Sequence, residues 1–513
     1  MNEKTPWEKA SAAEGTTDSE RALTRLARKA FLSLWSYSNV YTDEGRTKGK
    51  GDGKELVDLL IVFGNDVLLF SDKACAFQSD IDPKIAWPRW YRRAIEKSAR
   101  QLAGAENFLR RFPKRVYIDR HCQTSLPVAL PDLSAARYYL IAVTRGGHAA
   151  AASFYGQGSS GSLLLNNMLE ADDHYATPFQ VGFPLKGRRF IHVLDEVTVD
   201  LLLEELDTVP DIVAYLSCKE SYFGSEGTYV NVAGEEELLA QYMCTMEEGR
   251  HALPKIPAGT AGIALLEGDW DFYRASPQRA AKRDADKGSY MWDDLLEYQA
   301  SFIRAGTALG LPDMPPEPPD HERVLRALAD ESRLSRRELA AHFRHALSHS
   351  EPGKKFARMT FSGDKRTRAY VFLTAPKDKD EDYQGYREKR SMALLAYCHG
   401  IKLRFPFATE AIGVASEPFS ELVSSQDFLY VDLDRELGND EEAMWCEAME
   451  ELDVLQQPQA EIQLFRKRSQ EFPMPFRFGG PKFRDYETGM PINRAARRKM
   501  ERAARSKKNK KAS

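Results

Sequence analysis

Cysteine is scarce in this 513-residue sequence, and long apolar runs are missing. The six cysteines stand far apart and include no CxxC pair, which argues against a structural zinc site and a disulfide framework. The first residues, MNEKTPWEKASAAEG, are polar and lack the hydrophobic segment of a signal peptide. No stretch has the length and apolarity of a membrane span. These absences predict a cytoplasmic protein with no membrane partner.

Histidine is also sparse and forms no convincing metal-binding cluster. Three of the ten histidines, His342, His345 and His349, have helical spacing. They lie in a polar, Arg-rich segment, so the spacing predicts a solvated helix face. The apolar fraction of 42% and the charged fraction of 29% are ordinary for a globular protein, which leaves ample material for hydrophobic cores.

The net charge of −4 is unevenly distributed along the chain. From Arg494 onward there are ten Lys or Arg and one acid, a net +9 that leaves −13 for the rest. An acidic body with a basic tail is typical of chains that bind nucleic acid; a solubilising tail is the alternative. The tail residues singled out for nucleic-acid binding are Arg494, Arg497, Arg498, Lys499, Arg502 and Arg505.

The length predicts two or three domains. The first residues are small, polar and aperiodic, which favours disorder, and the Pro-rich stretch LPDMPPEPPD favours a linker. We therefore expect a disordered N-terminus (1–17), an α/β domain with an extension (18–225), a helical extension (226–310), a linker (311–320), an α+β domain (321–470) and an aromatic and basic tail (471–513).

The most informative stretch is ELVDLLIVFGNDVLLFSDK, Glu55 to Lys73. Two apolar runs flank a Gly64-Asn65-Asp66 turn, which predicts a tight β-hairpin. Asp58 opens the first strand, and Lys73 ends the second. A carboxylate and a lysine held at one end of a hairpin can bind a divalent cation and position a water molecule.

Helical patterns lie on both sides of this hairpin. Before it, Asp18 or Ser19 is expected to cap a helix with Glu20 in its first turn. After it, a helix from about residue 90 to residue 111 carries Lys97 and Gln101 four residues apart, on one face. Strand patterns follow at 115–118 and 138–143. The order helix, hairpin, helix, strand, strand predicts an α/β sandwich around a mixed sheet.

On these residues, the segment from about 19 to 145 resembles the PD-(D/E)xK nuclease-like superfamily. The resemblance implies a restriction-endonuclease-like fold whose carboxylates hold Mg²⁺ or Mn²⁺ and whose lysine orients the attacking water. Carried over, Asp58 is the first metal ligand, Lys73 is the lysine and Glu20 is the helix acid. Gln101 is the supporting residue on the following helix, with Lys97 one turn before it as a nucleic-acid contact.

The segment departs from the family pattern at one position. Two residues before Lys73 stands Ser71, where the family has Asp or Glu. In a regular strand Asp72 points to the opposite face of the sheet. Three explanations stay open: a bulge turns Asp72 inward, Glu55 supplies the missing carboxylate, or the site has lost its chemistry. Asp58, Lys73, Glu55, Asp72 and Gln101 are therefore the candidate catalytic residues, and Asp58, Glu55, Asp72 and Glu20 the candidate metal ligands.

Two functions follow as expectations. The first is a Mg²⁺-dependent nuclease in bacterial defence or DNA processing, with DNA favoured over RNA as the expected substrate; this rests on the resemblance. The second is an inactive nuclease-like fold that binds nucleic acid or protein through its basic tail. A third, remote option is a toxin-type or partner-recognition protein that acts through its C-terminal domain. The oligomeric state is left open.

Three other motifs favour structural explanations. Gly156 to Gly161 matches GxGxxG but lacks the strand before it and the acid after it, which predicts a loop. The run SRLSRRELAAHF, Ser332 to Phe343, is expected to be one helix, with a helix-turn-helix as the alternative. The segment from Phe472 to Arg484 is expected to be an irregular strap, with base stacking as the alternative.

Overall fold

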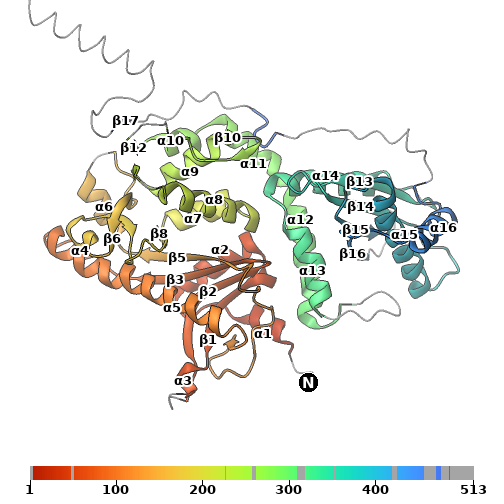
Figure 1. Cartoon of the computed structure of the whole chain (residues 1–513), viewed down its shortest axis with the longest axis horizontal. Coiled ribbons are helices and arrows are strands. Elements are labelled where there is room, and N and C mark those ends of the chain that lie inside the picture. Colours follow the sequence, from red (N-terminus) through yellow and green to blue (C-terminus); the bar gives the residue numbers. More distant parts are fainter. Residues whose placement is uncertain are drawn as a thin grey trace, which may run out of the picture. The chain divides into compact units, whose positions relative to one another are not determined.

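The computed structural model describes residues 4–47, 51–156, 158–225, 227–256, 261–308, 318–351, 353–418, 425–455, 470–474 and 484–485. The chain is a mixed α/β protein with several sheets. It divides into two compact units (Figure 1). We name them the N-terminal unit, Glu8–Ala280 with Met474–Ser513, and the C-terminal unit, Met1–Trp7 with Ala281–Pro473.

The first sheet of the N-terminal unit is mixed and six-stranded, in the order β4-β1-β2-β3-β5-β8. The strands β1, β2 and β3 form an antiparallel meander, and β5 and β8 continue it in parallel with β3. The strand bounds are β1 (Ser36–Thr42), β2 (Lys54–Phe63), β3 (Asp66–Ala74), β4 (Val116–Tyr117), β5 (Arg137–Arg145) and β8 (His192–Asp195).

The predicted hairpin is present as β2 and β3. Phe63 pairs with Asp66 across a two-residue turn of Gly64 and Asn65. Gly64 has a φ of +58°, the positive value that glycine adopts at the first central position of a hairpin turn. The apolar residues of the hairpin are buried from Leu56 to Phe63 and from Val67 to Phe70, because helices cover both faces of the sheet.

Two helices sandwich this sheet (Figure 1). Helix α2 (Asp18–Phe31) brings Phe31 against Phe70, with ring centroids 6.4 Å apart. Helix α5 (Lys97–Arg111) covers the opposite face of the sheet. The Oγ of its Ser98 lies 3.4 Å from the Oγ of Ser71, which follows Phe70 in β3 and so points to the other side. Together with the strands, the chain therefore runs α2, β1, β2, β3, α5, β5. Helix α4 (Pro83–Tyr91) and a π-helical turn (Arg92–Glu96) precede α5.

Two expectations for the N-terminus are wrong. Residues 1–17 include helix α1 (Pro6–Ala12), in which Trp7 is 8% and Ala10 5% exposed, so burial of apolar side chains orders part of a polar segment. The cap of α2 is Thr17, whose side chain accepts from the N–H of Glu20 at 3.2 Å. Glu20 reciprocates toward the backbone of Thr17 in a capping box.

A second sheet of the N-terminal unit has the order β17-β12-β9-β6-β7. The range 226–310, expected as a helical extension, contains helices α9 to α12 and also strands such as β9 and β12, which join this sheet. The strands are β6 (Leu164–Glu170), β7 (Gln180–Phe183), β9 (Tyr229–Val232), β12 (Gly262–Leu265) and β17 (Arg484–Asp485), with β10 (Met246–Glu247) and β11 (Arg250–His251) paired separately.

Helices surround the strands of the N-terminal unit (Figure 1). The GxGxxG segment lies between α6 and β6, in agreement with its interpretation as a loop. The remaining helical elements are η1 (Ser33–Trp35), α3 (Glu44–Thr47), α6 (His148–Tyr155), η3 (Ala171–Ala176), α7 (Thr198–Glu205), α8 (Val209–Phe223), α9 (Glu235–Cys244), α10 (Asp269–Arg274) and α11 (Pro277–Asp286).

The C-terminal unit begins within α11, earlier than the Pro-rich stretch expected to divide the domains. Helix α12 (Tyr290–Ala305) belongs to it because Trp292 packs against Tyr370 and Phe372 of its sheet. The described residues include only Pro318–Asp320 of the expected linker, where α13 begins.

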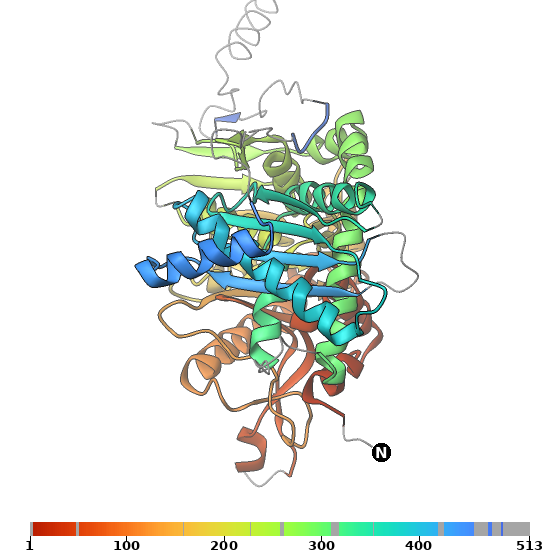
Figure 2. The same cartoon turned by 90° about the vertical axis from the view of Figure 1, so that its right-hand side faces the viewer.

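The sheet of the C-terminal unit has the order β13-β14-β15-β16. Figure 2 shows α15 and α16 in front of this sheet. The other helices are α13 (Pro318–Ala329), α14 (Arg333–Ser348) and η4 (Lys287–Ser289), and Ser332 to Phe343 enters a single helix. The remaining bounds are β13 (Phe356–Phe361), β14 (Arg368–Thr374), β15 (Glu410–Ser416), β16 (Gln426–Asp432), α15 (Tyr383–Arg404) and α16 (Asn439–Glu451).

Within the described residues, no helix combines the length and apolarity that crossing a bilayer requires.

Candidate active site

Asp58 is a buried carboxylate at the open end of the hairpin. It is 3% exposed, and its Oδ2 accepts from the backbone N–H of Asp72 at 2.5 Å. Burial raises the pKa of Asp58 to about 6; Lys73 and the N–H of Asp72 oppose this shift, and Glu55 and Glu20 add to it. Strongly shifted pKa values cluster at functional sites, which makes Asp58 a candidate functional residue.

Lys73 and Ser71 lie on the same face of the sheet as Asp58. Leu60 pairs with Leu69, so Asp58, two residues before Leu60, projects to the same side as Ser71 and Lys73. The Nζ of Lys73 lies 3.4 Å from the Oδ2 of Asp58, and its side chain is 27% exposed. Ser71 is fully buried, so at the family's acid position there is a hydroxyl that faces α5.

Asp72 is directed away from this group, which corrects its assignment as a metal ligand. Its carboxylate accepts a two-pronged interaction from Arg145 on β5, at 2.9 and 3.0 Å. The pairing of β3 with β5 is regular from Asp66 to Ala74, so no bulge turns Asp72 inward. Only its backbone N–H reaches Asp58. The ion pair with Arg145 fastens two strands of the sheet together.

Glu20 and Glu55 are brought together by an amide that the sequence did not single out. The Nδ2 of Asn39, on β1, donates to Glu55 at 2.8 Å and to Glu20 at 3.2 Å. Burial raises the pKa of Glu20, but hydrogen bonds from Thr16, Asn39 and Thr17 outweigh it and hold that pKa below its usual value. Glu55 is exposed at the strand end.

Asn39 can bridge the two acids because β1 is irregular there. Its φ is +47°, and the β1–β2 register shifts between Val40 and Tyr41. Asn tolerates positive φ better than most residues. The signal available from sequence was weak: an Asn inside a strand pattern, SYSNVYT, is unusual enough to suggest a local role.

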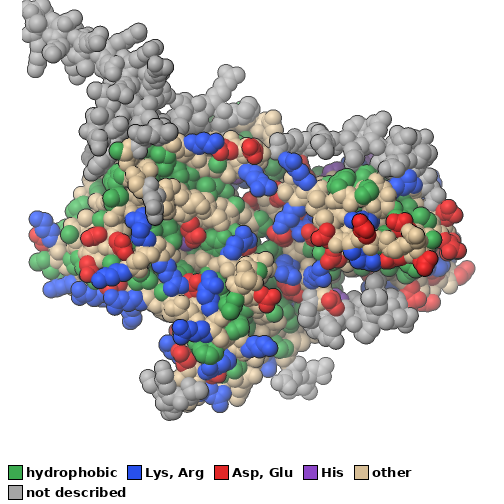
Figure 3. Space-filling view, viewed as in Figure 1, with side chains coloured by type: hydrophobic (Ala, Val, Ile, Leu, Met, Phe, Trp, Pro, Cys, Tyr) green, Lys and Arg blue, Asp and Glu red, His purple; other side chains and the backbone are tan. Residues whose placement is uncertain are grey.

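Helix α5 supplies a polar residue and a basic surface near this end of the sheet. The Nε2 of Gln101 donates to the backbone carbonyl of Leu56, two residues before Asp58, at 3.3 Å. Gln101 thus supports the β2 strand and is not directed at the acids. Lys97 is exposed. Figure 3 shows Lys and Arg side chains gathered over this helical stretch; its exposed members are Arg92, Arg93, Lys97, Arg100 and Arg111.

The donor set suits a hard divalent cation. Asp58, Glu55 and Glu20 are the carboxylates that could hold such an ion, and the two glutamates are near enough to Asp58 to raise its pKa. The carboxylate oxygens of these three acids are not among the described groups in which all oxygens lie within 4.8 Å of one another. Mg²⁺ does not require such a triad, because it usually keeps several waters and is held by one or two carboxylates.

The predicted nucleic-acid contacts of the tail, from Arg494 to Arg505, lie outside the described residues. Comparison with known proteins assigns no family: no family model, no curated protein and no solved structure matches the chain.

Proposed function

We propose that the N-terminal unit is a divalent-metal-dependent nuclease that hydrolyses phosphodiester bonds of DNA. The element order α2, β1, β2, β3, α5, β5, with three antiparallel strands followed by a parallel one, supports a restriction-endonuclease-like core. The observation that carries the proposal is the pairing of buried Asp58 with Lys73 at one strand end, beside Glu20 and Glu55.

Each residue has a distinct role in this proposal. Asp58, with Glu55 and Glu20, would hold Mg²⁺ or Mn²⁺, which supplies Lewis-acid activation of the phosphodiester and of a bound water. Lys73 is near enough to Asp58 to orient the attacking water beside those acids. Asn39 positions the two glutamates, and Gln101 steadies the strand before Asp58. The exposed cations of α5, Lys97 among them, offer contacts for the DNA backbone.

The test is cleavage of plasmid, linear and single-stranded DNA by the full chain with Mg²⁺ or Mn²⁺. Wild type should cut, and both Asp58→Ala and Lys73→Ala should lose activity. Lys54→Ala is the matched control, because this lysine is on the same hairpin but its side chain is 66% exposed and pairs with Glu44. A wild type that cuts nothing, or a Lys73→Ala variant as active as Lys54→Ala, refutes the proposal.

A second candidate function is DNA binding without cleavage. Fully buried Ser71 at the family's acid position, and the engagement of Asp72 by Arg145, favour it. It predicts salt-sensitive DNA binding that Asp58→Ala leaves unchanged. The cleavage assay with a parallel binding assay separates the two candidates.

A further inference from the structure

Two parallel strands of the second sheet end side by side, and acids follow both. β9 and β12 are parallel neighbours in which Val232 pairs with Leu265. Segments that leave the carboxyl ends of adjacent parallel strands emerge at the same edge, where α/β proteins commonly bind ligands. After β9 the chain enters α9 through Glu235, Glu236 and Glu237, and after β12 it passes through Glu267 before α10.

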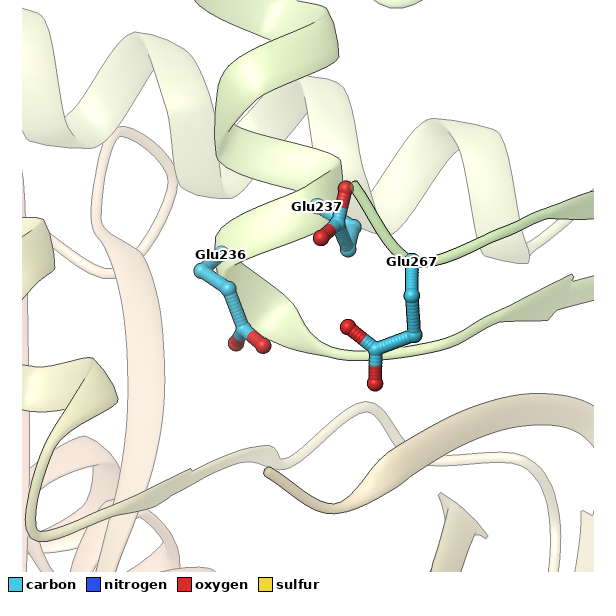
Figure 4. Close-up of side chains that lie close together, drawn as sticks. All are labelled: Glu236, Glu237 and Glu267. Atoms are coloured by element: carbon cyan, nitrogen blue, oxygen red, sulfur yellow. The ribbon is translucent and has the colours of Figure 1, made fainter. Parts of the chain in front are cut away.

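Three of these acids converge. One carboxylate oxygen from each of Glu236, Glu237 and Glu267 lies within 4.8 Å of the others, and Figure 4 shows the side chains reaching into a shared space. Acids in the first turn of a helix ordinarily complement the helix dipole from the solvent side. Here Glu236 is 3% and Glu237 2% exposed, so these two carboxylates are buried.

The backbone fixes two of the three carboxylates. Glu237 accepts from the N–H groups of Gly268, Asp269 and Trp270, at 2.9, 2.8 and 3.0 Å. Glu267 accepts from the N–H of Ser160, at 3.1 Å, in the loop between α6 and β6. Because a carboxylate has about four acceptor positions, both retain capacity for a further ligand.

Glu236 supplies the observation that points to a missing partner. Among the described residues, neither of its carboxylate oxygens has a hydrogen-bond partner of good geometry, and the nearby Ser160 and Ser162 hydroxyls offset only part of the rise that burial causes in its pKa. At the end of β8, buried Asp195 is close enough to raise the pKa of Glu236 further, and its Oδ2 lies 3.6 Å from the Nδ1 of His148. A buried carboxylate whose charge is not fully compensated destabilises the folded state, and a bound cation would offset that cost.

We propose that Glu236, Glu237 and Glu267 bind a divalent cation at a site separate from that of Asp58. All three donors are carboxylate oxygens, which select hard cations such as Ca²⁺, Mg²⁺ or Mn²⁺ over zinc. The three donor oxygens lie within 4.8 Å of one another, which is close enough for one hard cation to approach all of them. The bound cation joins the start of α9, the segment after β12 and, through Ser160, the loop after α6.

The test is calorimetric titration of the full, EDTA-treated chain with CaCl₂. It is done in an Asp58→Asn background, which removes the ligand of the other proposed site. This protein should bind one Ca²⁺, and adding Glu236→Gln or Glu267→Gln should weaken that binding at least tenfold. Asp271→Asn is the matched control, since this nearby acid on α10 is 75% exposed. Circular dichroism checks that each variant is folded.

Two results overturn the proposal. One is the absence of Ca²⁺ and Mn²⁺ binding in the Asp58→Asn background. In that case a proton shared among the three acids, and not a cation, compensates their charge. The other is a Glu236→Gln variant that binds like its Asp271→Asn control. As an independent readout, Ca²⁺ should slow amide exchange in residues 158–165 and 230–240. DNA cleavage plays no part in these outcomes, so the two proposed sites fail or succeed separately.

Discussion

Replacing Asp58 with Asn is expected to stabilise the metal-free protein at neutral pH while abolishing nuclease activity. Burial raises the pKa of Asp58 from 3.8 to about 6. An acid whose pKa is higher in the folded state binds more protons there, so its contribution to stability falls as pH rises between those values. At pH 7 the buried, ionised Asp58 therefore lowers the free energy of unfolding by about 3 kcal/mol.

Asn keeps the shape of Asp58 and an acceptor for the N–H of Asp72, but it carries no buried charge. Below about pH 3, under both pKa values, Asp58 is protonated in both states and the two proteins should be equally stable. At pH 7.5, the free energy of unfolding of Asp58→Asn should exceed that of wild type by about 1–3 kcal/mol. The lower figure allows for the loss of the negative charge beside Lys73.

The assay is amide hydrogen exchange of the Leu59–Phe70 segment in EDTA, because local exchange does not require the two units to unfold together. After correction for intrinsic rates, Asp58→Asn should exchange about tenfold to a hundredfold more slowly than wild type at pH 7.5, and equally at about pH 3. Asp72→Asn is the control: it leaves Arg145 unpaired, so exchange should become faster. Faster exchange in Asp58→Asn, or a ratio that ignores pH, would refute the reasoning.

Three further predictions concern the surroundings of the site. Asn39→Gly retains freedom for positive φ but removes the side-chain amide that holds Glu20 and Glu55. In a calorimetric titration its affinity for Mg²⁺ should fall about tenfold, which corresponds to the free energy of one hydrogen bond. An unchanged affinity would contradict this role of Asn39. Lys97→Ala should lower the slope of log affinity against log salt for duplex DNA by about 0.9, as expected for one lost phosphate contact, whereas an unchanged slope removes α5 from the DNA surface. Deleting residues 494–513 should lower that slope several-fold more, measured by fluorescence anisotropy; binding that survives unaltered makes the tail a solubilising segment.

Local patterns were sufficient to predict the hairpin and the helices on either side of it, but not strand β1, which pairs with β2. The apolar runs on either side of Gly64 have the length and composition of buried strands, and glycine fits the positive φ of the turn. The α+β class expected for residues 321–470 likewise agrees with the strands and helices that the structure describes there. Such signals are carried by neighbouring residues, so a single sequence reveals them.

The partners of the candidate site could not be predicted in this way, because they depend on pairings between distant segments. The carboxylate of Asp72 pairs with Arg145, 73 residues away, and Asn39 meets Glu20 and Glu55 only through an irregular strand. Glu236 and Glu267 were passed over for the same reason. First-turn acids are usually solvated, and only the adjacency of β9 and β12 shows that these converge.

The most direct measurement is a crystal structure of the protein soaked with Mn²⁺, with anomalous scattering to locate the ion. The account predicts Mn²⁺ in contact with Asp58 and with Glu55 or Glu20, beside the Nζ of Lys73. It is contradicted if, at saturating Mn²⁺, no anomalous peak lies against Asp58, or if Asp58 stays bound only to Lys73 and the N–H of Asp72.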